Sequence, residues 1–245
     1  MERHGELRPG TFRCDSNRLT QANLCDRLAA AIKTDLLEQV RDSLGHPLPV
    51  SGRNTIRLIE KTPKNILRIP FIDALFPDSL FVYLYRNPRE NISSIMDGWR
   101  SSRFVTYRWI RGRHGPWSFL LPPLWQSVVA KPLADVAAFQ WESANRYAVE
   151  DLSRLRPERW TTVAYEDLIA QPLTTVRRLC NFMGVVVDDA LLARCSGPLP
   201  LSRYTLTSPS EQKSEQNAAE LAPVVPQMEP LAKRLECLHM SKHSI

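Results

Sequence analysis

Hydrophobic residues near the start of the chain recur at the spacing of an amphipathic helix. The positions that share this spacing are Leu19, Leu24, Leu28, Ile32, Leu36, Val40 and Leu44. Such a recurrence predicts one long helix with an apolar stripe. Ser16 or Asn17 provides an N-cap for it, and Gly45 followed by HPLPVSG ends it.

Three short apolar runs, at residues 56–60, 80–85 and 160–165, predict strands. The second run is almost continuously apolar, which is typical of a strand buried in a parallel sheet. Helical patterns separate and follow the strands, at about residues 63–76 with a kink at Pro70, and at 87–100, 133–155 and 173–183. The alternation predicts an α/β fold, with a parallel sheet flanked by helices, in a single domain over residues 1–245.

Two segments lack a clear period. Residues 101–131 are rich in Trp, Pro, Arg and Gly, and a loop of this length is usually a lid or a binding segment. The alternative is a loop that covers the core or an interface. The tail is Pro/Ser-rich from residue 197 to about residue 213, and we expect it to be weakly helical after that.

The net charge of +6 favours anionic partners. Arg and Trp alternate in RWIRGRHGPW at residues 108–117, which makes single-stranded nucleic acid a candidate ligand. The other Arg residues are dispersed, however, and no nucleic-acid-binding motif is present. We therefore expect a small anion rather than a nucleic acid.

Cysteine and histidine positions indicate neither disulfides nor a metal site. The five Cys are scattered without a C-x-x-C pair, which is typical of reduced thiols in a cytoplasmic protein. His239 and His243 have i,i+4 spacing, but we expect the C-terminal tail to fray and hold no metal. No run approaches the roughly 18 apolar residues of a membrane helix, and the N-terminus is too polar for a secretory signal. The sequence predicts a cytoplasmic protein without a membrane span.

The most informative segment is residues 57–100, where two predicted strands each end on a cation. Lys61 follows the first strand and Arg86 follows the second. Ligands of parallel sheets bind beyond the carboxyl ends of the strands. An Asn-Pro pair after Arg86 begins a helix whose second turn carries Ser94. Free helix N–H groups, the Arg86 guanidinium and the Ser94 hydroxyl together predict a phosphate or sulfate site.

Each of these residues also has a purely structural interpretation. Arg86 could pair with Glu90, four positions on, which would leave Ser94 as a helix-surface serine. Lys61 could pair with its neighbour Glu60, and for Lys61 in isolation that interpretation is the stronger one. The repetition of a cation at two strand ends is what favours a shared anion.

These residues resemble the sulfotransferases. The resemblance is carried by EKTPKN at residues 60–65, FPDSLFVYLYRNPRENISS at 76–94 and VAYEDL at 163–168. It extends from about residue 16 to about residue 221 and is closest to bacterial proteins similar to tyrosylprotein sulfotransferases. It implies a P-loop-NTPase-like sulfotransferase fold that uses 3′-phosphoadenosine 5′-phosphosulfate (PAPS) as sulfonate donor. The acceptor would be a hydroxyl on a small molecule, glycan, lipid or peptide, and the in-line transfer would need no metal.

The resemblance also implies roles for individual residues. Arg86 and Ser94 would bind the 3′-phosphate of PAPS, and Tyr165 would line the nucleotide pocket. Lys61 would stabilise charge on the leaving bridge oxygen or the sulfonate. Two further roles fall in the C-terminal segment: Lys213 would close over the donor phosphates, and Ser202 or Ser208 would lie near the sulfonate.

One family motif is missing from the sequence. Family members begin with a strand and a glycine-rich loop of the type PRSGTT, which holds the 5′-phosphosulfate with backbone N–H groups. The 245 residues contain no such loop and no G-x-x-x-x-G-K-[ST] motif. We therefore expect the first βα unit to be absent and sulfonate transfer to be weak. Because the strand of that loop is normally central, its loss should also expose strand edges.

The remaining expectations are less specific. Glu2, near His4, is the first candidate for a general base and Glu6 the second, although two solvated carboxylates on a frayed terminus are the stronger interpretation. A non-catalytic module that binds the nucleotide or another polyanion is the alternative function. A homodimer is compatible with the sequence.

Overall fold

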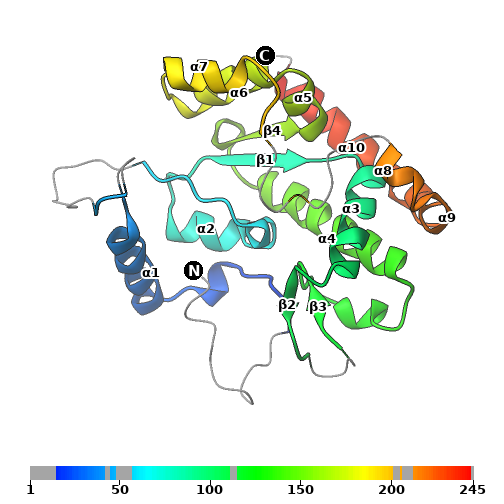
Figure 1. The fold of residues 1–245 in the computed structure, drawn as a ribbon. Helices are drawn as coiled ribbons and strands as arrows, with labels where there is room; N and C mark the ends of the chain where they lie inside the picture. Colours follow the sequence, from blue (N-terminus) through cyan, green and yellow to red (C-terminus); the bar gives the residue numbers. More distant parts are fainter. Residues whose placement is uncertain are drawn as a thin grey trace.

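The chain folds around a short parallel sheet. The computed structural model describes residues 15–41, 45–47, 57–110, 115–200, 205 and 212–243, without the side chains of residues 212, 213 and 243. Strands β1 (Phe81–Tyr85) and β4 (Trp160–Ala164) pair in parallel, with Phe81 opposite Trp160 and Tyr85 opposite Ala164. Helices flank this sheet (Figure 1), which confirms the predicted α/β class.

Helix α4 contacts α2, α3 and α10, and α10 packs on β4. Figure 1 shows α5, α6 and α7 together at the end of the molecule beyond β4. The α-helices of the described residues are α1 (Asp26–Gln39), α2 (Ile69–Leu75), α3 (Pro88–Arg100), α4 (Leu133–Leu152), α5 (Tyr165–Ala170), α6 (Pro172–Met183), α7 (Asp189–Cys195), α8 (Gln212–Glu215), α9 (Ala218–Leu221) and α10 (Val225–His243).

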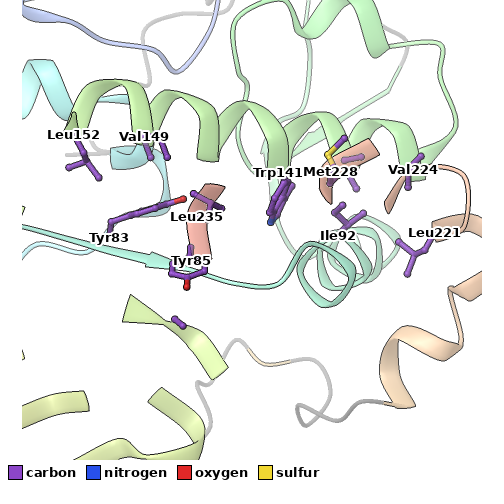
Figure 2. Packing of buried hydrophobic residues seen from close by; sticks show 14 of the residues in the cluster. Tyr83, Tyr85, Ile92, Trp141, Val149, Leu152, Leu221, Val224, Met228 and Leu235 are labelled. Carbon is purple, nitrogen blue, oxygen red and sulfur yellow. The ribbon is translucent and has the colours of Figure 1, made fainter. Parts of the chain in front are cut away.

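The main core lies on one face of β1. Tyr83 and Tyr85 point into it and pack among residues of α3, α4 and α10, including Ile92, Trp141 and Leu235 (Figure 2). The Tyr83 hydroxyl is buried and donates a hydrogen bond of 2.5 Å to Asn145 Oδ1 of α4. A polar group inside an apolar core needs such a partner, because an unpaired one would cost stability.

The opposite face of β1 is open. Val82 and Leu84 are 41% and 50% exposed, whereas every residue of β4 is buried. The two strands are hydrogen-bonded directly to each other. Among the described residues, the outer edge of each strand has no ladder partner. Apolar surface is thus exposed on the β1 face.

The predicted strand at residues 56–60 is wrong for its described part. Residues 57–60 form no ladder, and Ile59 is 83% exposed. Arg57 instead donates to the backbone oxygens of Met183 and Gly184 at the end of α6. A strand requires a partner for its backbone groups, and the apolar pattern alone cannot supply one.

Two predicted helices are shorter than expected. The first begins only at Asp26, after a 3-10 turn at Gln21–Asn23, and it buries no residue. The segment after Thr62 divides into a 3-10 helix, η3 (Pro63–Leu67), and α2. Pro70 lies in the first turn of α2, where its missing N–H costs no helical hydrogen bond. Pro70 therefore helps to start a helix instead of kinking one.

The C-terminal segment is more ordered than its sequence suggested. Helix α10 runs for 19 residues and packs on α4, β4 and α3, so the expected frayed tail is wrong. Its buried side chains include Met228 and Leu235, and Leu221 and Val224 precede them at heptad spacing. The helix thus covers the core between α4, β4 and α3.

Residues 101–131 build a second, smaller core. Their described part contains an antiparallel pair, β2 (Val105–Tyr107) and β3 (Trp117–Ser118), and the 3-10 helix η4 (Trp125–Val128). Trp117 and Trp125 are buried and meet edge to face, with ring centroids 5.5 Å apart. These two side chains therefore behave as expected for a loop that covers a core, which was the alternative interpretation of this segment. Trp109, by contrast, is 87% exposed.

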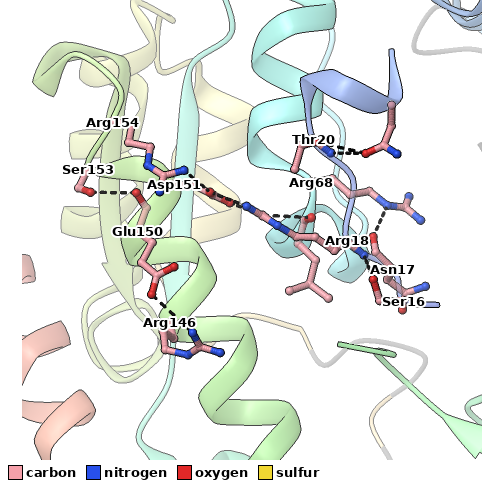
Figure 3. A network of polar contacts seen from close by, with 12 residues as sticks. Ser16, Asn17, Arg18, Thr20, Arg68, Arg146, Glu150, Asp151, Ser153 and Arg154 are labelled. Atoms are coloured by element: carbon pink, nitrogen blue, oxygen red, sulfur yellow. Dashed lines mark hydrogen bonds and ion pairs between the residues drawn. The ribbon is translucent and has the colours of Figure 1, made fainter. Parts of the chain in front are cut away.

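A buried ion pair anchors the N-terminal segment to α4. The Arg18 guanidinium forms two hydrogen bonds with the carboxylate of Asp151, one of them 2.7 Å long, and Asp151 is 2% exposed (Figure 3). Arg18 also donates to the Leu67 oxygen and lies 4.6 Å from the centroid of the Tyr147 ring. A buried carboxylate is tolerated only with partners of this kind.

Candidate functional site

The candidate site lies where the two parallel strands end. Arg86 follows β1 and Tyr165 follows β4, and the Arg86 Cζ atom is 4.6 Å from the centroid of the Tyr165 ring. This packing fixes the guanidinium against an aromatic face. Trp141 supports the turn from the core side by donating to the backbone oxygen of Arg86, at 3.4 Å. The structure therefore brings Arg86 and Tyr165 together, as the resemblance implies.

Arg86 is only partly satisfied by its neighbours. Its ion pair with Glu90 is long, at 3.9 Å, and its Nε atom is buried without a hydrogen-bond partner. Pairing with Glu90 thus accounts for one terminal nitrogen of the Arg86 guanidinium, whereas the Nε atom remains unpaired. A buried, unpaired donor is costly, and an anionic ligand would satisfy it.

The N-terminus of α3 begins directly after Arg86. The Asn87 side chain caps it by accepting from the Arg89 N–H, as the sequence predicts. The Asn87 N–H donates to Glu166 Oε1 of α5 at 3.1 Å, so this end of the helix already attracts a carboxylate. Ser94 is half-buried on the same helix, and its hydroxyl makes no hydrogen bond among the described residues.

A second cation stands near the same edge of the sheet. Arg178 of α6 has two buried nitrogens, Nε and one terminal nitrogen, without hydrogen-bond partners. Its charge acts on the Tyr85 hydroxyl at the end of β1, and lowers the pKa of that group slightly. Arg86 has one such unpaired nitrogen and Arg178 has two, and donors of this kind suit an anion such as a phosphate.

Burial nevertheless dominates the titration of Tyr85. The pKa of Tyr85 is raised from 10.0 to about 12, mainly by desolvation and, to a smaller extent, by the carboxylates of Asp167, Glu166 and Glu236. Burial also raises the pKa of Tyr83. Both phenols therefore stay neutral at physiological pH, which keeps additional negative charge away from the edge of the sheet.

Lys61 is exposed and stands apart from these contacts. It precedes η3 in a segment without regular structure, and among the described residues it has no ion pair. Its neighbour Glu60 accepts instead from Thr62 Oγ1, at 2.6 Å, and from Asn65. The alternative Lys61–Glu60 pair is therefore absent from the described part of the chain. No contact joins Lys61 to Arg86 there either.

The other predicted site residues are described only in part. The backbone of Lys213 lies in α8, which packs on α3, but its side chain is outside the described residues. Ser202, Ser208, Glu2, His4 and Glu6 also lie outside the described residues. Their predicted roles remain predictions.

Besides Arg178, two polar groups near the site were missed from the sequence. His239 of α10 contacts Asp167 Oδ2 at 2.9 Å and Thr162 Oγ1 at 2.9 Å, and its ring meets Tyr85 edge to face. Asn217, before α9, bonds to three residues of α3. The heptad spacing from Leu221 to Leu235 could have indicated a packed C-terminal helix. No local signal indicated the polar partners.

The described residues show no group of three or more His, Cys, Asp or Glu side chains that could hold a metal ion. Within the same residues, no helix is long and apolar enough to cross a membrane.

The chain is similar to solved structures of sulfotransferase domains. Two solved structures are similar at 20% identity: the sulfotransferase domain from the curacin biosynthetic pathway, with a TM-score of 0.38, and the sulfotransferase domain of the Synechococcus PCC 7002 olefin synthase, with a TM-score of 0.40. Each similarity covers 66% of this chain and 58% or 57% of the other, so the chain spans less than two thirds of either domain. No curated protein matches the chain in a sequence comparison.

The family assignment rests on a longer match. Residues 8–189, which are more than half of the chain, match the profile of the sulfotransferase family. The match includes Lys61, Arg86, Ser94, Tyr165 and Arg178, and it ends before Lys213 and Asn217. Members of this family transfer sulfonyl groups and generally use PAPS as the donor. The chain belongs to the sulfotransferase family.

Proposed function

We propose that this protein binds PAPS at the carboxyl end of β1 and takes part in transferring its sulfonate to an acceptor hydroxyl. The observation that carries the proposal is the state of Arg86. Its guanidinium is held on Tyr165 beside the N-terminus of α3, yet its buried Nε has no partner. A 3′-phosphate placed there would satisfy this donor, and Ser94 would supply a hydroxyl.

The other residues complete the proposed donor site. Tyr165 would line the nucleotide pocket, and Lys213 would come over the donor phosphates from α8. Lys61, which is exposed and unpaired in the described residues, would neutralise charge on the leaving oxygen or the sulfonate. Ser202 and Glu2 keep their proposed roles beside the sulfonate and as general base. When bound, PAPS supplies an activated sulfonate that can pass to the acceptor oxygen.

We further propose that the described half of the site binds the donor better than it activates it. The sequence contains no glycine-rich loop to hold the 5′-phosphosulfate. Positioning and electrostatic stabilisation are the main catalytic contributions in this type of transfer. A chain without those backbone donors should therefore transfer sulfonate slowly. The exposed Val82 and Leu84 face of β1 is available to a further structural unit.

The acceptor is proposed only as a class. A hydroxyl of a small molecule, glycan, lipid or peptide would fit the chemistry of the family. Trp109 is the exposed aromatic side chain of the 101–131 segment and is our candidate for contact with such an acceptor. The buried Trp117 and Trp125 are not available for that contact.

Donor use is tested by incubating the 245-residue protein with radiolabelled PAPS and a panel of phenolic, glycan and peptide acceptors. Release of adenosine 3′,5′-bisphosphate and label transfer are measured together, and intact mass confirms the chain. We expect slow transfer that falls further in Arg86→Ala and is unchanged in Arg89→Ala. Rapid transfer would contradict the proposed requirement for the loop, and equal rates for the two variants would contradict the role of Arg86.

A non-catalytic nucleotide-binding module is the second candidate. The observation that favours it is the combination of unsatisfied arginine donors with a sequence that lacks the glycine-rich loop. It predicts tight binding of adenosine 3′,5′-bisphosphate without transfer from PAPS to any acceptor. Transfer that depends on Arg86 would rule it out.

A further inference from the structure

The polar contacts between α3 and the C-terminal segment centre on one asparagine. The Asn217 amide nitrogen donates to Ser93 Oγ at 2.9 Å and to Asp97 Oδ1 at 3.1 Å. Its amide oxygen accepts from a terminal nitrogen of Arg100 at 2.6 Å. Asn217 is 4% exposed and Ser93 is fully buried. Both ends of the amide are thus used, in a place where water has little access.

Only an amide fits these partners. Ser93 and Asp97 present acceptors, whereas Arg100 presents a donor. A carboxylate at position 217 would face the carboxylate of Asp97, and an apolar side chain would remove all three hydrogen bonds. An arrangement with such narrow chemical requirements holds one segment against another in a single register.

The contacts lie next to the proposed donor site. Ser93 immediately precedes Ser94 on α3, and Asn217 stands four residues after Lys213. Helix α8, which carries the Lys213 backbone, contacts α3, and Leu221 continues the attachment into the main core. Fixing Asn217 on α3 therefore fixes the backbone of α8 beside the helix that would bind the 3′-phosphate.

We infer that Asn217 is a positioning residue of the donor site. It holds the segment Gln212–Leu221 on α3 so that this segment can close over a nucleotide bound at Arg86 and Ser94. The inference rests on the proposed function, because it assigns Asn217 to the same nucleotide site. Like Lys213, Asn217 lies beyond residue 189, where the match to the family profile ends.

The test is a double-mutant cycle on the affinity for adenosine 3′,5′-bisphosphate, measured by calorimetry on the full chain. The variants are Asn217→Asp, Lys213→Ala and the combination. Loss of hydrogen bonds to charged partners predicts a fall of about tenfold for Asn217→Asp. If Asn217 acts through the segment that carries Lys213, the combination should bind about as weakly as the weaker single variant.

Two further variants separate positioning from folding. Ser93→Ala removes one acceptor with little change in shape and should weaken nucleotide binding about threefold, with a modest fall in the unfolding temperature that leaves the protein folded. Glu220→Gln removes the more exposed Arg100–Glu220 ion pair and is the matched control, with an expected change below twofold. If Asn217→Asp does not fold, Ser93→Ala takes its place in the cycle.

The outcomes distinguish a failure of the positioning role from a failure of the proposed function. Additive losses in the cycle, or wild-type affinity in the Asn217→Asp or Ser93→Ala variants, would overturn the positioning role while leaving the proposed function intact. An unchanged affinity in Lys213→Ala would also overturn it, together with the proposed contact of Lys213 with the donor phosphates. Failure of the wild-type protein to bind the nucleotide would instead overturn the proposed function, and the inference with it.

Discussion

The Arg86 guanidinium rests on the Tyr165 ring, with 4.6 Å between Cζ and the ring centroid, and this contact joins the ends of the two parallel strands. Each residue is positioned by its own strand, since Arg86 follows β1 and Tyr165 follows β4. The contact aligns a partly buried cation with the start of α3. Among the described residues, Arg86, Tyr165 and the start of α3 come nearest to forming a complete anion-binding site.

Removing the aromatic ring should loosen Arg86. A cation–π contact contributes about 0.5–2 kcal/mol, so Tyr165→Leu should weaken binding of adenosine 3′,5′-bisphosphate by roughly two- to thirtyfold. Tyr165→Phe keeps the ring and should bind within about threefold of wild type. Calorimetric titration of both variants checks this. If the phenylalanine variant binds as weakly as the leucine variant, the phenol hydroxyl, and not the ring face, is the important group.

Breaking the ion pair between Arg18 and Asp151 should destabilise the whole fold. Asp151 is 2% exposed, and removal of one partner from a buried pair typically costs about 3–5 kcal/mol. We expect Arg18→Met to lower the free energy of unfolding in denaturant by about this amount. Glu150→Gln is the control, because the Arg146–Glu150 pair is about 40% exposed at each end and should contribute less than about 1 kcal/mol. Similar losses in both variants would contradict the anchoring role of Arg18.

Gly98 is required by close packing against Phe119. A Cβ atom at position 98 would lie 2.6 Å from Phe119 Cε2 and even closer to Cζ, and the Phe119 ring is stacked on Phe104. Overpacking costs about 1–3 kcal/mol, against a gain of about 1 kcal/mol in helix propensity. We expect Gly98→Ala to lower stability by about 1–2 kcal/mol in chemical denaturation.

A matched control exists at Gly197, where an added Cβ would meet no atom within 4 Å. Gly197→Ala should change stability by less than about 0.5 kcal/mol. In a Phe119→Ala background only the milder contact with Phe104 Cδ2, at 3.3 Å, remains, so Gly98→Ala should lose most of its destabilising effect. If it destabilises as much there as in the wild type, Phe119 is not the residue that excludes a side chain at position 98.

The raised pKa of Tyr85 predicts that the folded protein loses stability at alkaline pH. Its pKa is raised to about 12 in the folded protein, mainly by burial, against 10.0 for an ordinary tyrosine. Folding therefore favours the neutral phenol, and this contribution is complete below pH 10 and is lost as the pH rises through about 12. Denaturant midpoints measured from pH 8 upwards should fall more steeply for wild type than for Tyr85→Phe. Parallel profiles for the two proteins would show that Tyr85 ionises equally well when folded.

The sequence predicted the parts of the site that depend on local chemistry. The apolar run of β1, the Asn87 cap and the place of Arg86 before α3 follow from residues close together in the chain. Tyr165 was found through resemblance, since β4 and β1 are separated by about 75 residues and no local rule joins them.

Prediction from the sequence failed where contacts between distant parts of the chain determine the structure. Residues 57–60 have the composition of a strand, yet no strand pairs with them. Asn217 and His239 bind partners 72–124 residues away, and their own surroundings in the sequence carry no sign of this. The Trp-rich segment has the composition of a binding loop, but its Trp117 and Trp125 are held in a small core of their own. Hydrophobic content alone cannot separate these outcomes.

The central claim is that Arg86 and its neighbours bind a 3′-phosphate, and affinity for two matched nucleotides tests it most directly. Adenosine 3′,5′-bisphosphate and adenosine 5′-monophosphate differ only in that phosphate, and both are titrated into wild type and Arg86→Ala at one salt concentration. A charge-assisted contact predicts that wild type prefers the bisphosphate by about tenfold or more, and that Arg86→Ala largely loses this preference. Equal affinity of the wild-type protein for the two nucleotides, or an equal preference in the variant, would contradict the claim.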